Sequence, residues 1–180
     1  MKMIFERSCE RRRITQDSLP VFLYSDESQY FYIREGRQDM MFQTTCRSQR
    51  VITVCLTQSI SNYLSITGNG SDAEIHSYIA NLRTKIFLAN GSIQNNKFSS
   101  DSIGQTEQWR LNISTSPKGE NSFSQSQQWL PELPPILLQG LRTGGPQNDW
   151  LVDGYVHVIG RIWKASKKNY VKASFKQIKL

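Results

Sequence analysis

Three short apolar runs, separated by segments with helical patterns, constrain the fold of this chain more than any other feature. The runs are "VFLYS" (21–25), "VITVCLTQ" (51–58) and "TKIFLAN" (84–90). Runs of this composition favour β-strands, and a run without polar alternation is typical of a strand buried on both faces. Such strands in alternation with helices predict an open α/β sheet, mostly parallel, with right-handed crossovers.

The segments around these runs have the composition and periodicity of helices. Residues 5–14 predict a short basic helix, and residues 36–50 predict a helix with an apolar cluster. Residues 71–83 place apolar side chains on one helical face. A polar segment after the third strand predicts a short helix that ends near Gly104.

The chain changes character after residue 113. Residues 114–128 are rich in Ser and Gln and predict a polar, mobile loop, while the last 30 residues predict a small hairpin of two strands. We therefore expect four parts. They are 1–18, the end of an upstream helix; 19–113, the α/β core; 114–128, the polar loop; and 129–180, a C-terminal extension with short strands.

The positive charge of the chain is concentrated at its C-terminal end. The net charge is +7, and residues 161–180 hold seven basic and no acidic residues, so the remaining 15 basic residues balance the 15 acidic ones. The seven are Arg161, Lys164, Lys167, Lys168, Lys172, Lys176 and Lys179. Such a segment could contact phosphates, or it could be a lysine-rich surface hairpin that keeps the chain in solution.

Cysteine usage and hydropathy bear on the compartment. The three cysteines, Cys9, Cys46 and Cys55, are odd in number and form no CxxC pair, which argues against a disulfide framework and a zinc site. No stretch approaches the roughly 20 apolar residues of a membrane span. The first 15 residues carry charge where a signal peptide has an apolar core. We expect a cytoplasmic chain.

Two adjacent acids, Asp26 and Glu27, follow the first predicted strand. An apolar strand that ends in Asp-Glu has the form of a Walker B motif, in which the Asp holds Mg²⁺ through water and the Glu polarises the attacking water. The chemistry requires both at the carboxyl end of a strand. The alternative is a solvated strand terminus, and Ser25 replaces the apolar residue usual before the Asp.

Two further polar residues flank the second predicted strand. Gln58 ends it, where P-loop motors place a sensor of the γ-phosphate, and we expect it to converge with the acid pair on one phosphate-sized spot. The alternative is a Gln that merely begins a loop, which is common. Arg47 precedes it, and a planar guanidinium suits the charge of phosphoryl transfer. An arginine favoured by the dipole at a helix C-terminus is the alternative for Arg47.

Taken in order, several segments resemble the C-terminal half of TraD/TraG-type type IV secretion coupling proteins, in the region labelled the TraM-recognition domain. The segments are "PVFLYSDESQYF", "FQTTCRSQRVITVCLTQSISNYLSITG", "NLRTKIFLANGSIQNNKFSSDSIGQ", "LRTGGPQNDWLVDGYV" and "GRIWKASKKNYVKASFKQ". Their order and spacing carry the resemblance, which covers nearly the whole chain.

The resemblance implies a partial RecA-like P-loop NTPase sheet with a small C-terminal β-hairpin extension. Members of this family are hexameric ATPases, anchored in the inner membrane, that drive DNA translocation in conjugation. By resemblance, Asp26 is the Mg²⁺-associated Walker B Asp, Glu27 the catalytic Glu and Gln58 the motif-three Gln. Arg47 falls where an arginine finger acting in trans is proposed. The implied cofactors are ATP and Mg²⁺. The implied partners are DNA, a TraM-type relaxosome protein, and either the upstream half of the motor or a homo-hexamer.

One expected motif is missing, because the sequence contains no GxxxxGK[ST] and therefore no Walker A loop. We therefore expect a C-terminal fragment of a coupling ATPase that is inactive alone and active where an upstream segment supplies the loop. The alternatives are a non-catalytic docking module for relaxosome proteins or DNA, and an unrelated α/β domain. A sheet without its P-loop strand has an exposed edge, so we expect marginal stability or aggregation.

Overall fold

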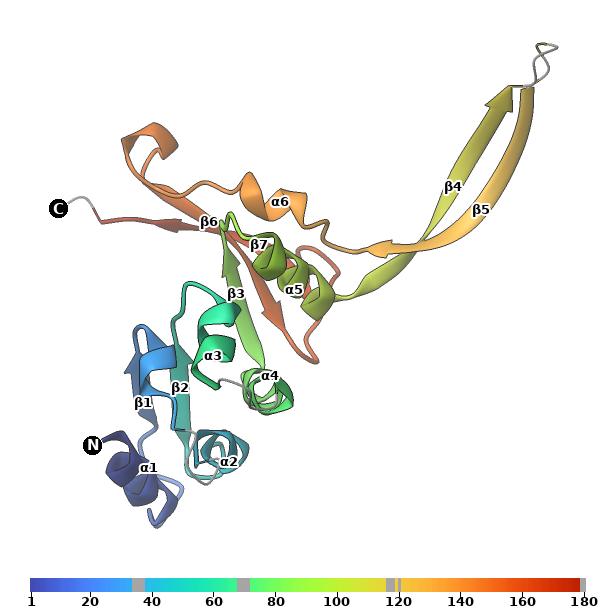
Figure 1. Cartoon of the computed structure of the whole chain (residues 1–180). Helices are drawn as coiled ribbons and strands as arrows, with labels where there is room; N and C mark the ends of the chain where they lie inside the picture. The colour runs from blue at the N-terminus through green and yellow to red at the C-terminus, as the bar shows by residue number, and fades with distance from the viewer. Residues whose placement is uncertain (34–37, 68–71, 116–118, 120, 179–180) are drawn as a thin grey trace. The chain divides into compact units, whose positions relative to one another are not determined.

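The computed structural model describes residues 1–33, 38–67, 72–115, 119 and 121–178. The chain divides into two compact parts, unit 1 (Met1–Arg83) and unit 2 (Thr84–Leu180) (Figure 1). The core expected over 19–113 is thus split between the units, because the third predicted strand belongs to unit 2.

Unit 1 consists of a parallel strand pair and short helices. Its elements are α1 (Lys2–Glu10), β1 (Val21–Ser25), η1 (Ser28–Phe31), α2 (Gln38–Thr45), β2 (Val51–Cys55), α3 (Ile60–Thr67) and α4 (Asp72–Asn81). The expected helices of segments 36–50 and 71–83 are confirmed as α2 and α4, whereas α3 was not predicted.

Strands β1 and β2 are parallel and in register from Val21 opposite Val51 to Ser25 opposite Cys55. One face of the pair packs on the core of unit 1, where Val51 joins Cys9, Phe42 and Cys46. Burial raises the pKa of the Cys9 and Cys46 thiols, which pack as small apolar groups.

The other face of the pair is largely uncovered. Phe22 and Tyr24 stack at 6.2 Å between ring centroids and remain 52% and 69% exposed, and Ile52 beside Phe22 is 44% exposed. The expectation of strands buried on both faces is therefore wrong for β1. Parallel sheets normally have both faces covered.

Unit 2 combines two antiparallel sheets with short helices. Its elements are β3 (Thr84–Leu88), α5 (Ile93–Ile103), β4 (Gln105–Thr115), β5 (Asn121–Pro131), α6 (Ile136–Gln139), η3 (Pro146–Asn148), β6 (Leu151–Val158) and β7 (Tyr170–Lys176). The predicted helix before Gly104 is confirmed as α5, and Gly104 adopts a φ of 109° that favours glycine.

The main sheet of unit 2 has the order β3-β6-β7, with every neighbouring pair antiparallel. Its core face carries Phe87, Tyr155 and Tyr170, which pack with Ile103 of α5. The other buried members of this core, Leu133, Leu138 and Leu141, come from the segment around α6. The predicted C-terminal hairpin is confirmed as β6 and β7.

The mostly parallel sheet is not observed, because one of the four strand pairings in the described part of the chain is parallel. The apolar run of β3 predicts a strand but does not specify its neighbour. In the structure that neighbour is β6, with Ile86 opposite Val156. The longer β6 offers a hydrogen-bonding edge to strands on both sides.

The polar loop expected over 114–128 is also corrected. Strands β4 and β5 form an antiparallel ribbon, in register from Gln105 opposite Pro131 to Thr115 opposite Asn121. Residues 121–128 thus belong to β5. Their Ser/Gln-rich composition resembles a loop because polar residues occupy both faces of β5, and the apolar face becomes clear only when the two strands are aligned.

Candidate functional site at the strand tips of unit 1

The carboxyl ends of β1 and β2 lie side by side, and their backbone pairing continues past the strands. The Leu56 amide donates to the Ser25 carbonyl at 2.9 Å, and the Ser28 amide donates to the Leu56 carbonyl at 2.9 Å. The segments that carry Asp26, Glu27 and Gln58 are therefore held at one edge of the parallel pair. The sequence predicted this convergence from the order of the strands.

Glu27 and Gln58 are in direct contact. Gln58 Nε2 donates to Glu27 Oε1 at 2.7 Å, and Gln29 Nε2 donates to Glu27 Oε2 at 2.6 Å. Thr57 Oγ1 in turn donates to Gln29 Oε1 at 2.9 Å. The carboxylate of Glu27 thus accepts from two amides, one on each side, and Gln29 links it back to the end of the second strand.

Glu27 also has an unusual backbone conformation. Its φ and ψ are both 47°, in the left-handed region that non-glycine residues seldom adopt. Such a conformation costs on the order of 1–3 kcal/mol and persists only where the surroundings enforce it. Here the following turn, η1, and the hydrogen bonds of the side chain hold Glu27 in place.

A layer of buried hydroxyl groups lies beneath the strand tips. Ser28 Oγ donates to the Leu56 carbonyl at 2.7 Å and accepts from the Tyr63 hydroxyl at 2.5 Å. The rings of Tyr32, Tyr63 and Tyr78 pack against one another, with centroids 5.1–6.0 Å apart. Burial raises the pKa of Tyr63 to about 12, so its hydroxyl stays protonated and donating at neutral pH.

Sequence reasoning missed Gln29, Ser28 and Tyr63, which support the site. Gln29 and Ser28 are only 3% exposed, yet both directly follow the acid pair in a polar segment. A signal was available, since a polar residue in the turn after a strand tip can reach back to the adjacent tip. Nothing in the spacing alone pairs Ser28 with Tyr63, 35 residues away.

Asp26 lies at the same edge but faces solvent. Its Oδ1 accepts from the Glu27 amide at 2.9 Å, and the residue is exposed. A carboxylate in this position is accessible to a hydrated metal ion. The described residues contain no group of three or more His, Cys, Asp and Glu side chains that could hold a metal by themselves.

Arg47 is remote from the other three predicted site residues. It is exposed and precedes β2, whereas Gln58 follows the end of that strand, so the two residues flank opposite ends of the parallel pair. Its neighbour Arg50 has a structural role, because Arg50 Nη1 donates to the carbonyls of Gln16 and Ser18 at 2.9 and 2.6 Å.

The basic C-terminal segment lies on the β6–β7 hairpin and its turn, except for Lys179, which is outside the described residues. The other six basic side chains are exposed. Two of them neutralise acids: Lys168 pairs with Glu132, and Lys172 lies 3.2 Å from Asp153. The guanidinium of Arg161 stacks over Trp163 at 4.1 Å.

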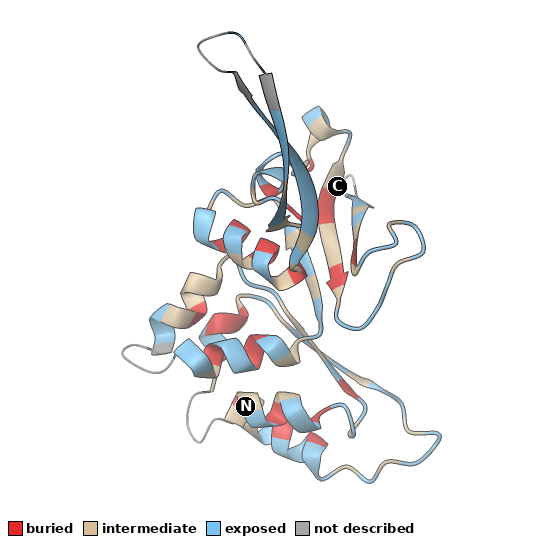
Figure 2. Cartoon of the chain, turned by 90° about the vertical axis from the view of Figure 1, so that its right-hand side faces the viewer, coloured by how far each residue is buried: buried red, intermediate tan, exposed pale blue. Residues whose placement is uncertain are grey.

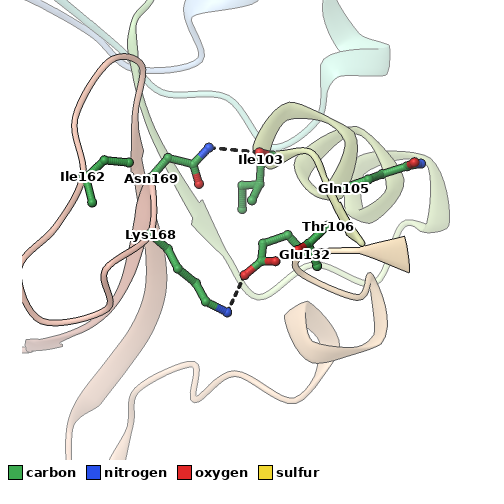
Figure 3. Close-up of a pocket in the computed structure, with 7 residues that line it drawn as sticks. All are labelled: Ile103, Gln105, Thr106, Glu132, Ile162, Lys168 and Asn169. Atoms are coloured by element: carbon green, nitrogen blue, oxygen red, sulfur yellow. Dashed lines mark hydrogen bonds and ion pairs between the residues drawn. The ribbon is translucent and has the colours of Figure 1, made fainter. Parts of the chain in front are cut away.

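A pocket of about 410 Å³ lies at the base of the ribbon in unit 2 (Figure 3). Figure 3 shows that its polar groups contact one another: Lys168 pairs with Glu132, and Asn169 Nδ2 donates to the Ile103 carbonyl at 3.0 Å. These contacts join the base of the ribbon to the β6–β7 turn, so we assign the pocket an architectural role.

In the part of the chain that the structure describes, no helix has the length and apolar character needed to cross a membrane.

Comparison with known proteins identifies the class of this chain. Residues 20–138 match the family described as the TraM recognition site of TraD and TraG. The match covers more than half of the sequence, and the chain belongs to this family. No curated protein matches the chain.

Solved coupling proteins have the same fold. The chain is similar to the bacterial conjugative coupling protein TrwBdeltaN70 in its unbound form, with a TM-score of 0.66, 16% identity and 99% of this chain covered. It is also similar to the plasmid coupling protein TrwB in complex with the non-hydrolysable GTP analogue GDPNP, with a TM-score of 0.60, 15% identity and 94% covered. The chain spans 36% and 34% of the length of these two structures.

Proposed function

We propose that this chain is the C-terminal part of an ATPase that couples conjugative DNA transfer to a type IV secretion channel. The contact between Gln58 Nε2 and Glu27 Oε1, at 2.7 Å, carries the proposal, because it joins the tips of two parallel strands. Open α/β sheets bind their ligands at this edge. Membership of the TraD/TraG family is the supporting observation.

The residues at the strand tips fit one half of a nucleotide site. Bound Mg²⁺–ATP would supply the γ-phosphate that is hydrolysed and the metal charge that offsets its oxygens. Asp26 offers an exposed carboxylate for a metal contact through water, and Glu27 offers an oriented base. The phosphate-binding loop must come from another segment, since the sequence contains no GxxxxGK[ST].

The geometry gives Glu27, Gln29 and Gln58 three different roles. Gln29 holds Glu27 Oε2 from the buried side. The carboxylate therefore keeps its orientation when the more exposed Gln58 amide turns from Glu27 Oε1 toward a phosphate oxygen. In this arrangement Glu27 takes a proton from the attacking water, and Gln58 changes its hydrogen-bond partner according to whether phosphate is bound.

Arg47 cannot join this site within one subunit, because it flanks the opposite end of the strand pair. We propose that it acts in trans on the site of a neighbouring subunit, which requires assembly of a ring such as a homo-hexamer. An Arg47→Ala chain mixed with a Glu27→Gln chain then restores part of the activity, because each subunit supplies what its neighbour lacks.

The test is ATP hydrolysis by this chain, by a coupling-protein segment that carries Walker A, and by their mixture. We expect activity in the mixture, and a loss of about 10²-fold or more on Glu27→Gln. Glu10→Gln, an exposed carboxylate elsewhere in unit 1, is the matched control and keeps full activity. Undiminished hydrolysis by the Glu27→Gln mixture removes Glu27 from the mechanism.

A docking module without catalysis is the second candidate. The family description, TraM recognition site, favours it, as do the exposed basic residues of the β6–β7 hairpin. It predicts binding of a TraM-type protein, or salt-dependent binding of DNA, by a mixture that never hydrolyses ATP. If DNA is bound through phosphates, Lys164→Glu and Lys167→Glu each reduce the salt slope of the affinity by about one unit.

A further inference from the structure

Figure 2 shows most of the β4–β5 ribbon in the colour of exposed residues, and one face of the ribbon carries large apolar side chains. They are Trp109 (66% exposed), Leu111 (56%), Ile113 (59%), Phe123 (65%) and Trp129 (66%). Residues two apart on a strand share a face, and so do residues directly opposite in an antiparallel pair. Ile113 is opposite Phe123, and Trp129 is opposite Glu107, so all five apolar side chains lie on the same face.

The opposite face of the ribbon is polar. It carries Gln108, Arg110, Asn112, Ser124, Ser126 and Gln128. On this face Asn112 Nδ2 donates to Ser126 Oγ at 3.1 Å, so cross-strand pairs satisfy one another. In a strand pair with this alternation, the polar face is suited to contact with water, and the apolar face is suited to burial against another surface.

We propose that the apolar face of the ribbon docks against the same face of a second copy of this chain. Aromatic side chains bury about 150–250 Å² each, so two copies packed face to face would remove roughly 1,200 Å² of surface from water. That area reaches the lower limit for specific protein interfaces, about 1,200 Å² in total.

The charge of the ribbon favours docking to a second copy of this chain over binding to nucleic acid. Among the strand residues 105–115 and 121–131, Glu107 and Arg110 are the charged ones, so the ribbon is neutral in a chain of net charge +7. Arg110 lies on the polar face. A surface that binds phosphates requires excess positive charge. The apolar face instead carries the single charge of Glu107, near the base of the ribbon, so two copies packed in opposite directions place their Glu107 side chains at opposite ends of the interface.

The order of side chains along the face is compatible with a two-fold axis. When two ribbons pack in opposite directions, the row of Trp109 and Gln127 meets the row of Leu111 and Gln125 in the second copy. Trp109 then faces Leu111, Gln127 comes within reach of Gln125, and in the outer rows Trp129 faces Phe123 and Glu107 faces Ile113. An isologous interface requires this self-complementarity.

The base of the ribbon is held to the rest of unit 2 by hydrogen bonds and an ion pair, so the docking face lies on an element that is fixed within its unit. The Glu132 amide donates to the Gly104 carbonyl at 3.0 Å, and the Tyr170 hydroxyl donates to the Glu132 carbonyl at 3.3 Å. The Lys168–Glu132 ion pair joins the same base to the β6–β7 turn (Figure 3). The exposed face therefore belongs to an element anchored at both strands.

Sedimentation velocity over a range of about 1–100 µM tests the proposal, because interfaces near the lower size limit include weak, transient ones. We expect a reversible dimer. Leu111→Glu places a charge in the centre of the apolar face and weakens dimerisation by about tenfold or more. Gln108→Glu adds the same charge to the polar face of the same strand, and its dimerisation stays within about twofold of the parent chain.

Directed cross-linking tests the two-fold arrangement. Trp109→Cys chains mixed with Leu111→Cys chains should form a mixed disulfide dimer under mild oxidation, whereas Gln108→Cys mixed with Leu111→Cys should not. A chain that stays monomeric at about 100 µM overturns the proposal, and so does a dimer that Leu111→Glu leaves intact. Capture of DNA or of a TraM-type protein that Leu111→Glu abolishes in a monomeric chain assigns the face to that partner and overturns the proposal as well.

Discussion

The two units bury charge in opposite ways. In unit 2, both oxygens of the Asp153 carboxylate are saturated: they accept from Arg142 at 2.8 and 3.0 Å, from Ser174 at 2.7 Å and from Lys172 at 3.2 Å. In unit 1, two buried carboxylates, Glu6 and Asp39, share the ammonium of Lys2. One unit surrounds a single acid with two cations, and the other gives two acids a single cation.

The difference affects the pKa of the acids. Hydrogen bonds from Arg142 and Ser174 hold the pKa of Asp153 far below its usual range. Burial, together with the charge of Asp39, raises the pKa of Glu6 to about 7. Both Glu6 oxygens and Asp39 Oδ1 are buried without a hydrogen-bond partner, which destabilises the folded state. We therefore expect unit 1, which holds the candidate site and the left-handed Glu27, to be the less stable unit.

Removing the central side chain of unit 1 should give the largest effect. Phe42 is fully buried among Cys9, Cys46 and Val51, so Phe42→Ala should lower the free energy of unfolding by about 3–5 kcal/mol. Met41, its neighbour in α2, is 57% exposed, and Met41→Ala should cost about 0.5 kcal/mol or less. Hydrogen exchange should rise in residues 1–83 first. An equal increase of hydrogen exchange in both units of Phe42→Ala would mean that the two units fold and unfold together.

The matched change in unit 2 tests whether its core is independent. Leu138 is 1% exposed and packs with Leu133 and Ile103, so Leu138→Ala should cost about 2–5 kcal/mol. Leu137 is 47% exposed in the same short helix and provides the control. Urea unfolding measures the loss. We expect the Glu27–Gln58 site of unit 1 to keep its hydrogen-exchange protection in Leu138→Ala, and loss of that protection would contradict the separation of the units.

The two predicted strand tips show how far the sequence alone could lead. Apolar runs indicated β1 and β2, and their order in the chain indicated that Glu27 and Gln58 would meet, because two parallel strands end at one edge. The third strand misled the prediction, since the apolar residues of β3 do not specify whether its neighbour is β2 or β6. That choice depends on pairing over more than 60 residues of sequence separation, which no local pattern records.

The errors in the candidate site and the ribbon have the same origin. Gln29 was missed because its role depends on a turn conformation, the left-handed Glu27, and not on its own residue type. Strand β5 was missed because Gln125 and Gln127 separate Phe123 from Trp129 on its apolar face, so the two aromatic residues are too far apart to signal a strand alone. In both cases the information lies in which residues face each other after folding.

The pH dependence of unit 1 sharpens the contrast in buried charge. The pKa of Glu6 is raised from 4.5 to about 7, so the folded state holds a proton that the unfolded state releases. The stability that this proton contributes is present below pH 4.5 and lost as pH rises through about 7. We expect unit 1 to lose about 1–2 kcal/mol between pH 5 and 7.5, and Glu6→Gln to remove this loss. A parent chain whose unit 1 gains stability over this range would contradict the shared-cation arrangement.

Through His157, the stability of unit 2 should depend on pH in the opposite direction to that of unit 1, and this is the smallest of the expected effects. It is 3% exposed, its Nδ1 lies 3.2 Å from the Asn169 carbonyl, and burial together with the charge of Lys85 lowers its pKa. The folded state therefore favours the neutral ring, and the resulting stability, present above pH 6.5, is lost as pH falls through the lowered pKa. On acidification from neutral pH, the protection of the amides from hydrogen exchange, measured relative to the intrinsic exchange rate at each pH, should rise in unit 1 and fall in unit 2. His157→Asn should abolish the fall in unit 2, and His76→Asn, at an exposed position, should not. If both units respond to acid in the same direction, their titration is dominated by groups other than Glu6 and His157, and the difference in buried charge does not set their relative stability.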